Sequence, residues 1–213
     1  MLSFMRFLGT TVLSGRHSGE EKSISNLVPP KDEKKEVEIK LTSDGFLHEE
    51  FMPKKYASSR HHGGDNISPQ ISWNSSIPEG TKEIVLVMED PSAPLWYPIL
   101  HASTILSSDI WKDKDLPEGI LNYDQVKKDS NGNIIDSKFD YNGLMMGKNT
   151  IRSQTYGGPG PLPGHGPHRY VFTCFALSEK TGLSDNFNRD QLIQGLEGKI
   201  IGRGRLDGFY EMK

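Results

Sequence analysis

The sequence predicts a mainly β protein, an antiparallel β-sandwich with a few peripheral helices. Residues 84–88 and 170–177 are apolar on both strand faces, as expected of strands in the middle of a sheet. The 22 glycines and 13 prolines indicate many tight connections. Only residues 189–197 combine helical spacing with signals at both helix ends. Short strands joined by turns, with one clear helix, are typical of this fold class.

The remaining strands are shorter or only half buried. Apolar and charged residues alternate over residues 37–41, which predicts a strand with one face in the core. Residues 99–105 predict a further strand, and His101 lies inside it. The other predicted strand segments are residues 71–73, 200–201 and 206–210.

The predicted helix has a signal at each end. Asn188 is a favourable N-cap residue, and Asp190 places a negative charge in the first turn. Gly198 suits the left-handed position that follows a last turn, and Lys199 suits the negative end of the helix dipole. The apolar residues that would share one face are Leu192, Ile193 and Leu196.

Residues 1–36 are predicted to be an N-terminal extension of a domain that covers residues 37–213. Residues 14–36 are polar, charged and aperiodic, as expected of a linker. Residues 1–19 contain Arg6 and Arg16, several apolar side chains and no acidic residue. This composition resembles a mitochondrial presequence, and it also fits a helix that docks on the domain. We therefore expect a cytoplasmic protein, with the mitochondrion as the alternative.

A polar insertion is predicted at about residues 107–140. It contains two turn signals, Pro117-Glu118-Gly119 and Asn131-Gly132. Asn-Gly favours a two-residue hairpin turn, and Ile134 and Ile135 follow it. The insertion is therefore expected to carry a small exposed hairpin.

Charge and composition exclude several classes of protein. The net charge of −3 and the lack of a basic block argue against nucleic acid as a partner. No apolar run approaches the roughly 20 residues of a membrane-spanning helix. Cys174 is the single cysteine, so no internal disulfide can form. His61-His62 and His165 lack a well-spaced set of partner ligands, so we expect no metal and no cofactor.

The first candidate site begins where an apolar strand ends. Asp90 follows residues 84–88 directly, and Pro91 and Pro94 restrict the chain after it. His101 lies on a strand that could return beside Asp90. A carboxylate that accepts from one imidazole nitrogen fixes the tautomer and presents the other nitrogen to a ligand. Taken separately, Asp90 could equally begin a turn and His101 could be a core histidine.

The second candidate site is a rigid loop of glycine and proline that leads into a strand. Residues 157–167 can offer backbone groups at close range, because glycine has no side chain and proline fixes its own φ. His168, Arg169 and Tyr170 then supply an imidazole, a guanidinium and a phenol as donors. Such a loop favours a ligand with acceptor oxygens. Arg169 by itself is as readily explained as a structural ion-pair partner.

The two sites together resemble a known family. The segment DPSAP at residues 90–94, then His101, then GPGPLPGHGPHRY at residues 158–170 resemble the signature regions of the phosphatidylethanolamine-binding proteins. The segment GDNISPQISW at residues 64–73 resembles a third, earlier region of that family. The resemblance covers roughly residues 37–210, and its closing segments are similar to the bacterial and fungal-like branch.

The resemblance implies a large central antiparallel sheet, a smaller sheet and a small anion pocket near one end. It also implies that the Ala93–Pro94 bond is cis. The chain departs from the family at Ser92, where a second aspartate is usual, and at Leu162, where a second proline is usual. The residues that the resemblance places at the pocket are Asp90, Pro91, Pro94, His101, Gly158, Gly160, Pro161, His168 and Tyr170.

These observations predict a binding protein rather than an enzyme. The expected ligand is a small anion, either phosphate or a phosphorylated lipid headgroup. By resemblance, an alternative is a protein-interaction inhibitor of a serine carboxypeptidase or a kinase. A second alternative is a hydrolase that uses Asp90, His101 and His168, although the sequence shows no nucleophile with a base beside it.

Overall fold

The structure is a computed structural model of residues 1–213. It describes every residue except 1, 14, 60–62, 75, 124–126, 129, 131–133, 137–140 and 213.

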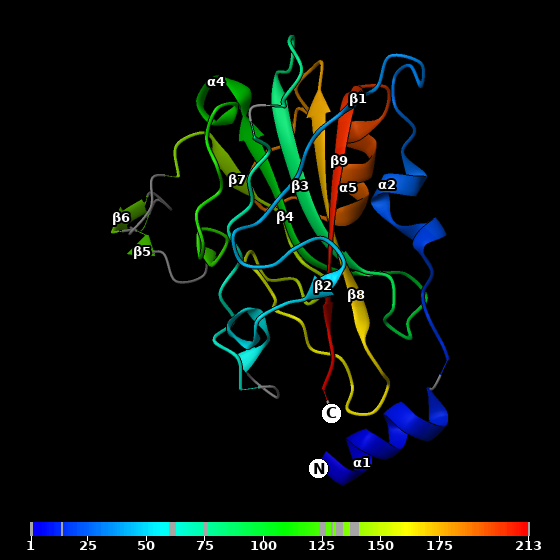
Figure 1. The fold of residues 1–213 in the computed structure, drawn as a ribbon. Coiled ribbons are helices and arrows are strands. Elements are labelled where there is room, and N and C mark those ends of the chain that lie inside the picture. The colour runs from blue at the N-terminus through cyan, green and yellow to red at the C-terminus, as the bar shows by residue number, and fades with distance from the viewer. Residues whose placement is uncertain are drawn as a thin grey trace.

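A seven-stranded sheet forms the centre of the molecule, as Figure 1 shows. The strand order is β1-β9-β8-β3-β4-β7, and β2 also pairs with β9. A separate two-stranded sheet pairs β5 with β6. The strands are β1 Val37–Glu38, β2 Glu50–Phe51, β3 Glu83–Asp90, β4 Ile99–Ser107, β5 Lys127–Lys128, β6 Ile134–Asp136, β7 Leu144–Met146, β8 His168–Leu177 and β9 Ile200–Tyr210.

The sheet confirms the predicted fold class, with one difference in detail. The short strands β1 and β2 run parallel to β9, whereas the other pairings of the large sheet are antiparallel. Residues 200–201 and 206–210 belong to one last strand, β9, as predicted, with Gly202 and Gly204 inside it. A side chain at Gly204 would collide with the backbone of residue 39, so glycine here lets the neighbouring chain approach closely.

Burial explains why the central strands are apolar on both faces. Leu86 and Met88 of β3 point into the larger core, which also holds Tyr170. Val85 and Val87 point to the other face, into a smaller core that α5 (Arg189–Leu196) and α2 (Ile24–Leu27) cover. The same alternation continues at the end of β3, so that Glu89 and Asp90 point to opposite faces of the sheet.

The helices are short, and α2 and α5 pack on one face of the sheet. The predicted helix is α5, which begins after Asn188; the side chains of Asn188 and Gln191 form a reciprocal capping box. Gly198 follows with a φ of 67°, in the left-handed region as predicted. The helices are α1 Leu2–Phe7, a π-helical segment Leu8–Val12, α2 Ile24–Leu27, α4 Ser108–Trp111 and α5 Arg189–Leu196, with 3₁₀ turns at Glu20–Lys22 and Lys54–Tyr56. Among the described residues, no helix is long and apolar enough to cross a membrane.

The predicted insertion is partly built into the core. Trp111, Leu116 and Leu121 are buried and belong to the larger core. The small sheet of β5 and β6 pairs antiparallel, as a hairpin requires. Asn131 and Gly132, which were predicted to make its turn, lie outside the described residues.

Candidate functional site

The end of β3 and the start of β8 bring Asp90 and His168 together. The Nδ1–H of His168 donates to Oδ2 of Asp90 at 2.8 Å, and each side chain is only 2–3% exposed. The other carboxylate oxygen, Oδ1, accepts from the backbone N–H of Ser92 at 2.9 Å. Asp90 is therefore held at both oxygens and orients a histidine, as the sequence predicts. The oriented residue is His168 on β8, not His101 on the neighbouring strand β4.

His101 presents an unpartnered nitrogen inside the protein. Its Nδ1–H donates to the carbonyl oxygen of Gly157 at 2.5 Å, which fixes the tautomer. Its Nε2 is buried and has no hydrogen-bond partner among the described residues. Burial lowers the pKa of His101, while the Asp90 carboxylate acts in the opposite direction. The neutral ring then offers a lone pair at Nε2.

Tyr170 lies between the two histidines. Its ring centroid is 5.2 Å from that of His101, edge to face, and 6.4 Å from that of His168, stacked. Its hydroxyl oxygen accepts from the N–H of Gly160 at 3.3 Å, so the hydroxyl hydrogen is left to donate. Burial raises the pKa of Tyr170 well above its usual value, and the phenol stays neutral.

The glycine and proline loop forms one wall of the site. The N–H of Gly158 donates to Oδ1 of Asn66 at 2.8 Å. A Cβ at Gly158 would collide with the carbonyl oxygen of Tyr56, so only glycine fits there. Pro161 is buried in the same loop. Asn66 was not among the predicted site residues, although it lies in the third family-like motif, because nothing local links it to a loop 92 residues away.

The Asp90–Pro94 turn lies at the other side of the site. The carbonyl oxygen of Pro91 accepts from the Ser18 hydroxyl at 3.0 Å. Pro94 is half-buried. The prediction of a cis Ala93–Pro94 bond is wrong, because no described peptide bond is cis. The turn closes with a trans bond, which X–Pro bonds ordinarily prefer, and the N–H of Leu95 donates to the Ala93 oxygen at 2.8 Å.

Residues 8–13 and 15–19, here called the N-terminal arm, cover the outer side of the site. Figure 1 shows the start of the chain below the loop that precedes β8, and Gly9 packs against the Pro163 carbonyl. The Nε2–H of His165 donates to the Leu13 oxygen at 2.9 Å, while the His17 ring donates to the Ser92 oxygen at 3.1 Å. The arm therefore packs against the loops on both sides of the site. That residues 1–19 are a presequence or a docking helix stays a prediction.

A chain of hydrogen bonds joins the arm to Asp90. Nδ1 of His165 lies 2.8 Å from Nε2 of His168, so one of these nitrogens donates to the other. The outer nitrogens of both rings also donate, to Leu13 and Asp90 respectively. Asp90, His168, His165 and Leu13 thus form one continuous hydrogen-bonded chain from the end of β3 to the arm.

One of the two departures from the family pattern has a structural role. The Ser92 hydroxyl oxygen accepts from the backbone N–H of Arg169 at 3.0 Å. At Leu162 the backbone oxygen accepts from the N–H of His165 at 3.1 Å, a contact that proline could also make. The Arg169 guanidinium donates to the buried Asp207 at 2.6 Å and to Glu49. Arg169 is thus a structural ion-pair partner and does not point its charge at His101.

The described residues contain no group of three or more histidine, cysteine or acidic side chains that could hold a metal ion. His61 and His62, which the sequence raised as weak candidates, lie outside the described residues.

Comparison with known proteins shows to which family the chain belongs. The family profile described as phosphatidylethanolamine-binding protein matches residues 42–211, and the chain belongs to this family. A relative in Aquifex aeolicus, known as a UPF0098 protein, is 33% identical over 81% of this chain and 88% of its own length.

Two solved structures share the fold. Escherichia coli YbcL, described as a member of the mammalian PEBP family, is 25% identical with a TM-score of 0.68 and covers 82% of this chain and 99% of its own. A PEBP homologue from Chlamydia trachomatis is 27% identical with a TM-score of 0.63 and covers 84% of this chain and 99% of its own. The family is thus named for binding and not for catalysis.

Proposed function

We propose that the site around His101 binds a small anion, either phosphate or a phosphorylated headgroup, without catalysing its conversion. The observation that carries this proposal is the buried, unpartnered Nε2 of His101. Buried polar atoms are nearly always hydrogen-bonded, so an orphan atom of this kind indicates a missing partner. The Tyr170 hydroxyl supplies a second donor at the same place.

The electrostatics of the site make anion binding depend on protonation. The neutral His101 ring has only a lone pair at Nε2 and cannot donate to an anion. An anion that binds there stabilises the protonated ring, so binding takes up a proton. Affinity should therefore fall as pH rises. Because burial lowers the pKa of His101, the fall should already begin below the ordinary histidine range.

The N-terminal arm limits access to the second histidine. Nε2 of His168 is already bonded to His165, which the arm holds through Leu13. A ligand that needs His168 must displace His165. His101 and Tyr170 can therefore contact a ligand directly. His168 can do so only after His165 has moved away from its Nε2.

The test is calorimetry with sulfate, which stays fully ionised over the pH range used. Any proton taken up on binding then comes from the protein. Sulfate titrated in two buffers of different ionisation enthalpy gives the number of protons directly. We expect net proton uptake in the native protein.

The matched variant is His101→Asn. An asparagine amide can keep the donor to Gly157 while it removes the atom at the Nε2 position. We expect about tenfold weaker sulfate binding and no proton uptake, since a charge-assisted hydrogen bond is lost. His48→Asn, at a histidine bonded to Asp207 elsewhere, is the control. Undiminished affinity and proton uptake in His101→Asn would show that His101 is not the binding group.

A further inference from the structure

A cavity of 580 Å³, which is a second candidate site, opens on the face of the sheet opposite His101. Leu100 lies in its floor and belongs to the smaller core, whereas the next residue of β4, His101, points to the other face. The two sites therefore share strand β4 but lie on opposite faces of the sheet. A cavity of this size is in the range that holds a small organic molecule.

One wall of the cavity carries two unpaired cations. Lys148 and Arg152 line it from the loop after β7, and their side chains make no hydrogen bond or ion pair with any residue that the structure describes. Thr150 lies between them, and its hydroxyl oxygen accepts from the Leu100 N–H at 2.8 Å. The Thr150 hydroxyl hydrogen is thus left to donate into the cavity.

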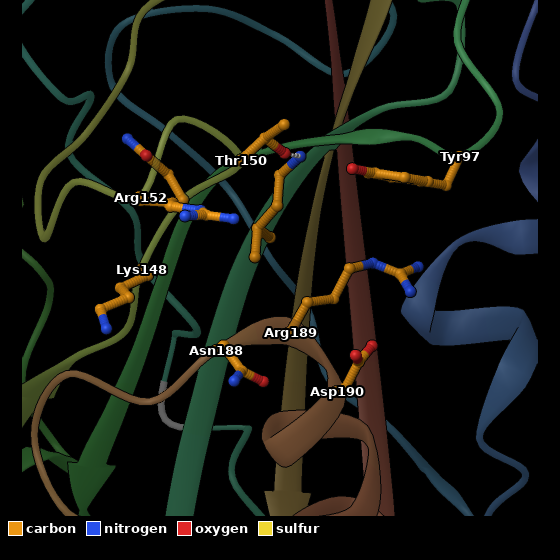
Figure 2. A pocket seen from close by; sticks show the side chains of 9 residues that line it. Tyr97, Lys148, Thr150, Arg152, Asn188, Arg189 and Asp190 are labelled. Atoms are coloured by element: carbon orange, nitrogen blue, oxygen red, sulfur yellow. Dashed lines mark hydrogen bonds between the residues drawn. The ribbon is translucent and has the colours of Figure 1, made fainter.

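The opposite wall is aromatic. Figure 2 shows the Tyr97 hydroxyl pointing into the cavity from the side opposite Lys148 and Arg152. The guanidinium of Arg189 points away in the same view, toward α2, where it donates to the Lys22 oxygen and pairs with Glu89 at 3.3 Å. Asp190, in the first turn of α5, is the one carboxylate among the lining residues.

Asn188 adds a donor at the base of the cavity. Its side-chain oxygen accepts from the N–H of Gln191, which leaves its amide NH₂ to donate. The side chains that line the cavity therefore carry more donors than acceptors and include the two unpaired cations.

The two segments 96–100 and 150–152, here called the rim, each carry an exposed apolar side chain next to lining residues in the sequence. Trp96 is 85% exposed and precedes Tyr97, while Ile151 is 68% exposed and stands between Thr150 and Arg152. The two segments are held together, because Thr150 and Leu100 also pair through their backbones. Exposed apolar side chains beside a polar hollow are typical of a binding site.

We propose that this cavity is a second binding site, for the phosphate group of a phosphomonoester whose remaining part is apolar. Lys148 and Arg152 contact the phosphate oxygens, with Thr150 and Asn188 as additional donors. The apolar part packs on Tyr97 and Leu100 and reaches the rim at Trp96. The ligand is either a soluble phosphomonoester or the headgroup of a phosphatidic acid membrane. The proposal does not depend on the site at His101.

The experiment uses the full chain that carries His101→Asn, so that the first site does not contribute. Calorimetry with phenyl phosphate probes the soluble source, with phenol as the uncharged comparison. Sedimentation with phosphatidylcholine vesicles, with and without phosphatidic acid, probes the membrane source. Trp96 reports membrane contact through a fluorescence blue shift, since Trp73 and Trp111 are only 1% and 4% exposed.

The deciding variant is Lys148→Gln together with Arg152→Gln. We expect about tenfold weaker binding for each cation removed, because each loses a charge-assisted contact with the phosphate. The exposed pair Lys34→Gln and Lys180→Gln makes the same change in net charge elsewhere and should have little effect. Lys148→Arg with Arg152→Lys should restore most of the affinity.

The two sources give different results. Saturable binding of phenyl phosphate that is lost in the double variant identifies a soluble ligand. Binding only to phosphatidic acid vesicles, with the blue shift of Trp96, identifies a headgroup. The proposal is overturned if neither probe binds, or if binding is the same in the double variant as in its parent.

Discussion

At the residue scale, the two acidic side chains at the end of β3, Glu89 and Asp90, have different roles on the two faces of the sheet. Asp90 points toward the His101 site and orients His168. Glu89 points to the other face, where the Ile24 N–H donates to it at 2.9 Å and Arg189 pairs with it. Neighbouring carboxylates in one strand thus serve a ligand site and a structural ion pair, because side chains alternate along a strand.

Glu89 gives the folded state a pH-dependent stability. Burial raises its pKa from 4.5 to about 7, against the attraction of Arg189. A carboxyl group whose pKa is raised by folding stabilises the folded state fully at pH values below its pKa in the unfolded chain. This contribution is lost as the pH rises through its pKa in the folded state. The free energy of unfolding should therefore fall by up to about 3 kcal/mol between about pH 4.5 and pH 7.

Glu89→Gln tests this contribution by urea unfolding at several pH values. Its amide cannot ionise, so the decline over this range should largely disappear. Glu38→Gln, at an exposed carboxylate of β1, should keep the native profile. An unchanged decline in Glu89→Gln would assign the pH dependence to another group.

A neighbouring pair of glycines tests the loop wall. At Gly158 a Cβ would collide with backbone atoms of Tyr56 and Ala57, whereas at Gly157 its nearest contact would be 3.6 Å away. Gly158→Ala should therefore lower the free energy of unfolding by about 1–3 kcal/mol, as other overpacking changes do. Gly157→Ala should leave it nearly unchanged. Equal effects in chemical denaturation would contradict the close approach at Gly158.

At the element scale, α5 depends on its N-cap. The oxygen of Asn188 accepts from the Gln191 N–H, and Oε1 of Gln191 accepts from the Asn188 N–H, each at 2.9 Å. Asn188→Ala should cost about 1 kcal/mol of stability, seen as a lower melting temperature. Asn188→Ser retains an oxygen that can cap and should be close to native. Equal losses in both variants would mean that Asn188 acts through the cavity wall and not through the cap.

The elements that the sequence predicted are those whose signals are local. β3 and β8 are apolar on both faces because both cores need them, and α5 carries its own caps. β1 lies within the strand predicted over residues 37–41, whereas β2 has no such signal. The parallel pairing of both strands with β9 was not predicted, because it depends on segments far apart in the chain.

The same distinction applies to the candidate site. Asp90, His101 and His168 were found from strand ends and motif resemblance. Asn66 and His165 were missed as site residues because their roles appear only when distant segments meet: His165 bonds to a carbonyl 152 residues earlier. The second cavity was also missed, since its walls come from three separate segments with no shared motif.

At the scale of the whole molecule, the N-terminal arm and the His101 site form one connected unit. The Ser18 N–H donates to the Ala93 oxygen at 2.8 Å, and the Gly19 N–H donates to the Pro91 oxygen at 3.1 Å. The Leu13 oxygen accepts a hydrogen bond from His165, and His165 is in turn hydrogen-bonded to Nε2 of His168. The arm therefore stabilises the arrangement in which Nε2 of His168 is unavailable to a ligand.

Removal of residues 1–16 should strengthen sulfate binding. His165 loses its Leu13 acceptor and is freer to release His168, which can then donate to the anion alongside His101. Because the hydrogen bond between His165 and Leu13 no longer opposes binding, we expect the affinity for sulfate to be up to about tenfold higher. Removal of residues 1–7 is the matched control, because it deletes α1 but keeps the contacts of Leu13, His17 and Ser18. Calorimetry with sulfate compares the two truncated chains. Equal affinities would mean that the arm packs on the domain without controlling the site. A gain in affinity confined to the chain without residues 1–16 would mean that the arm limits access of the anion to His168.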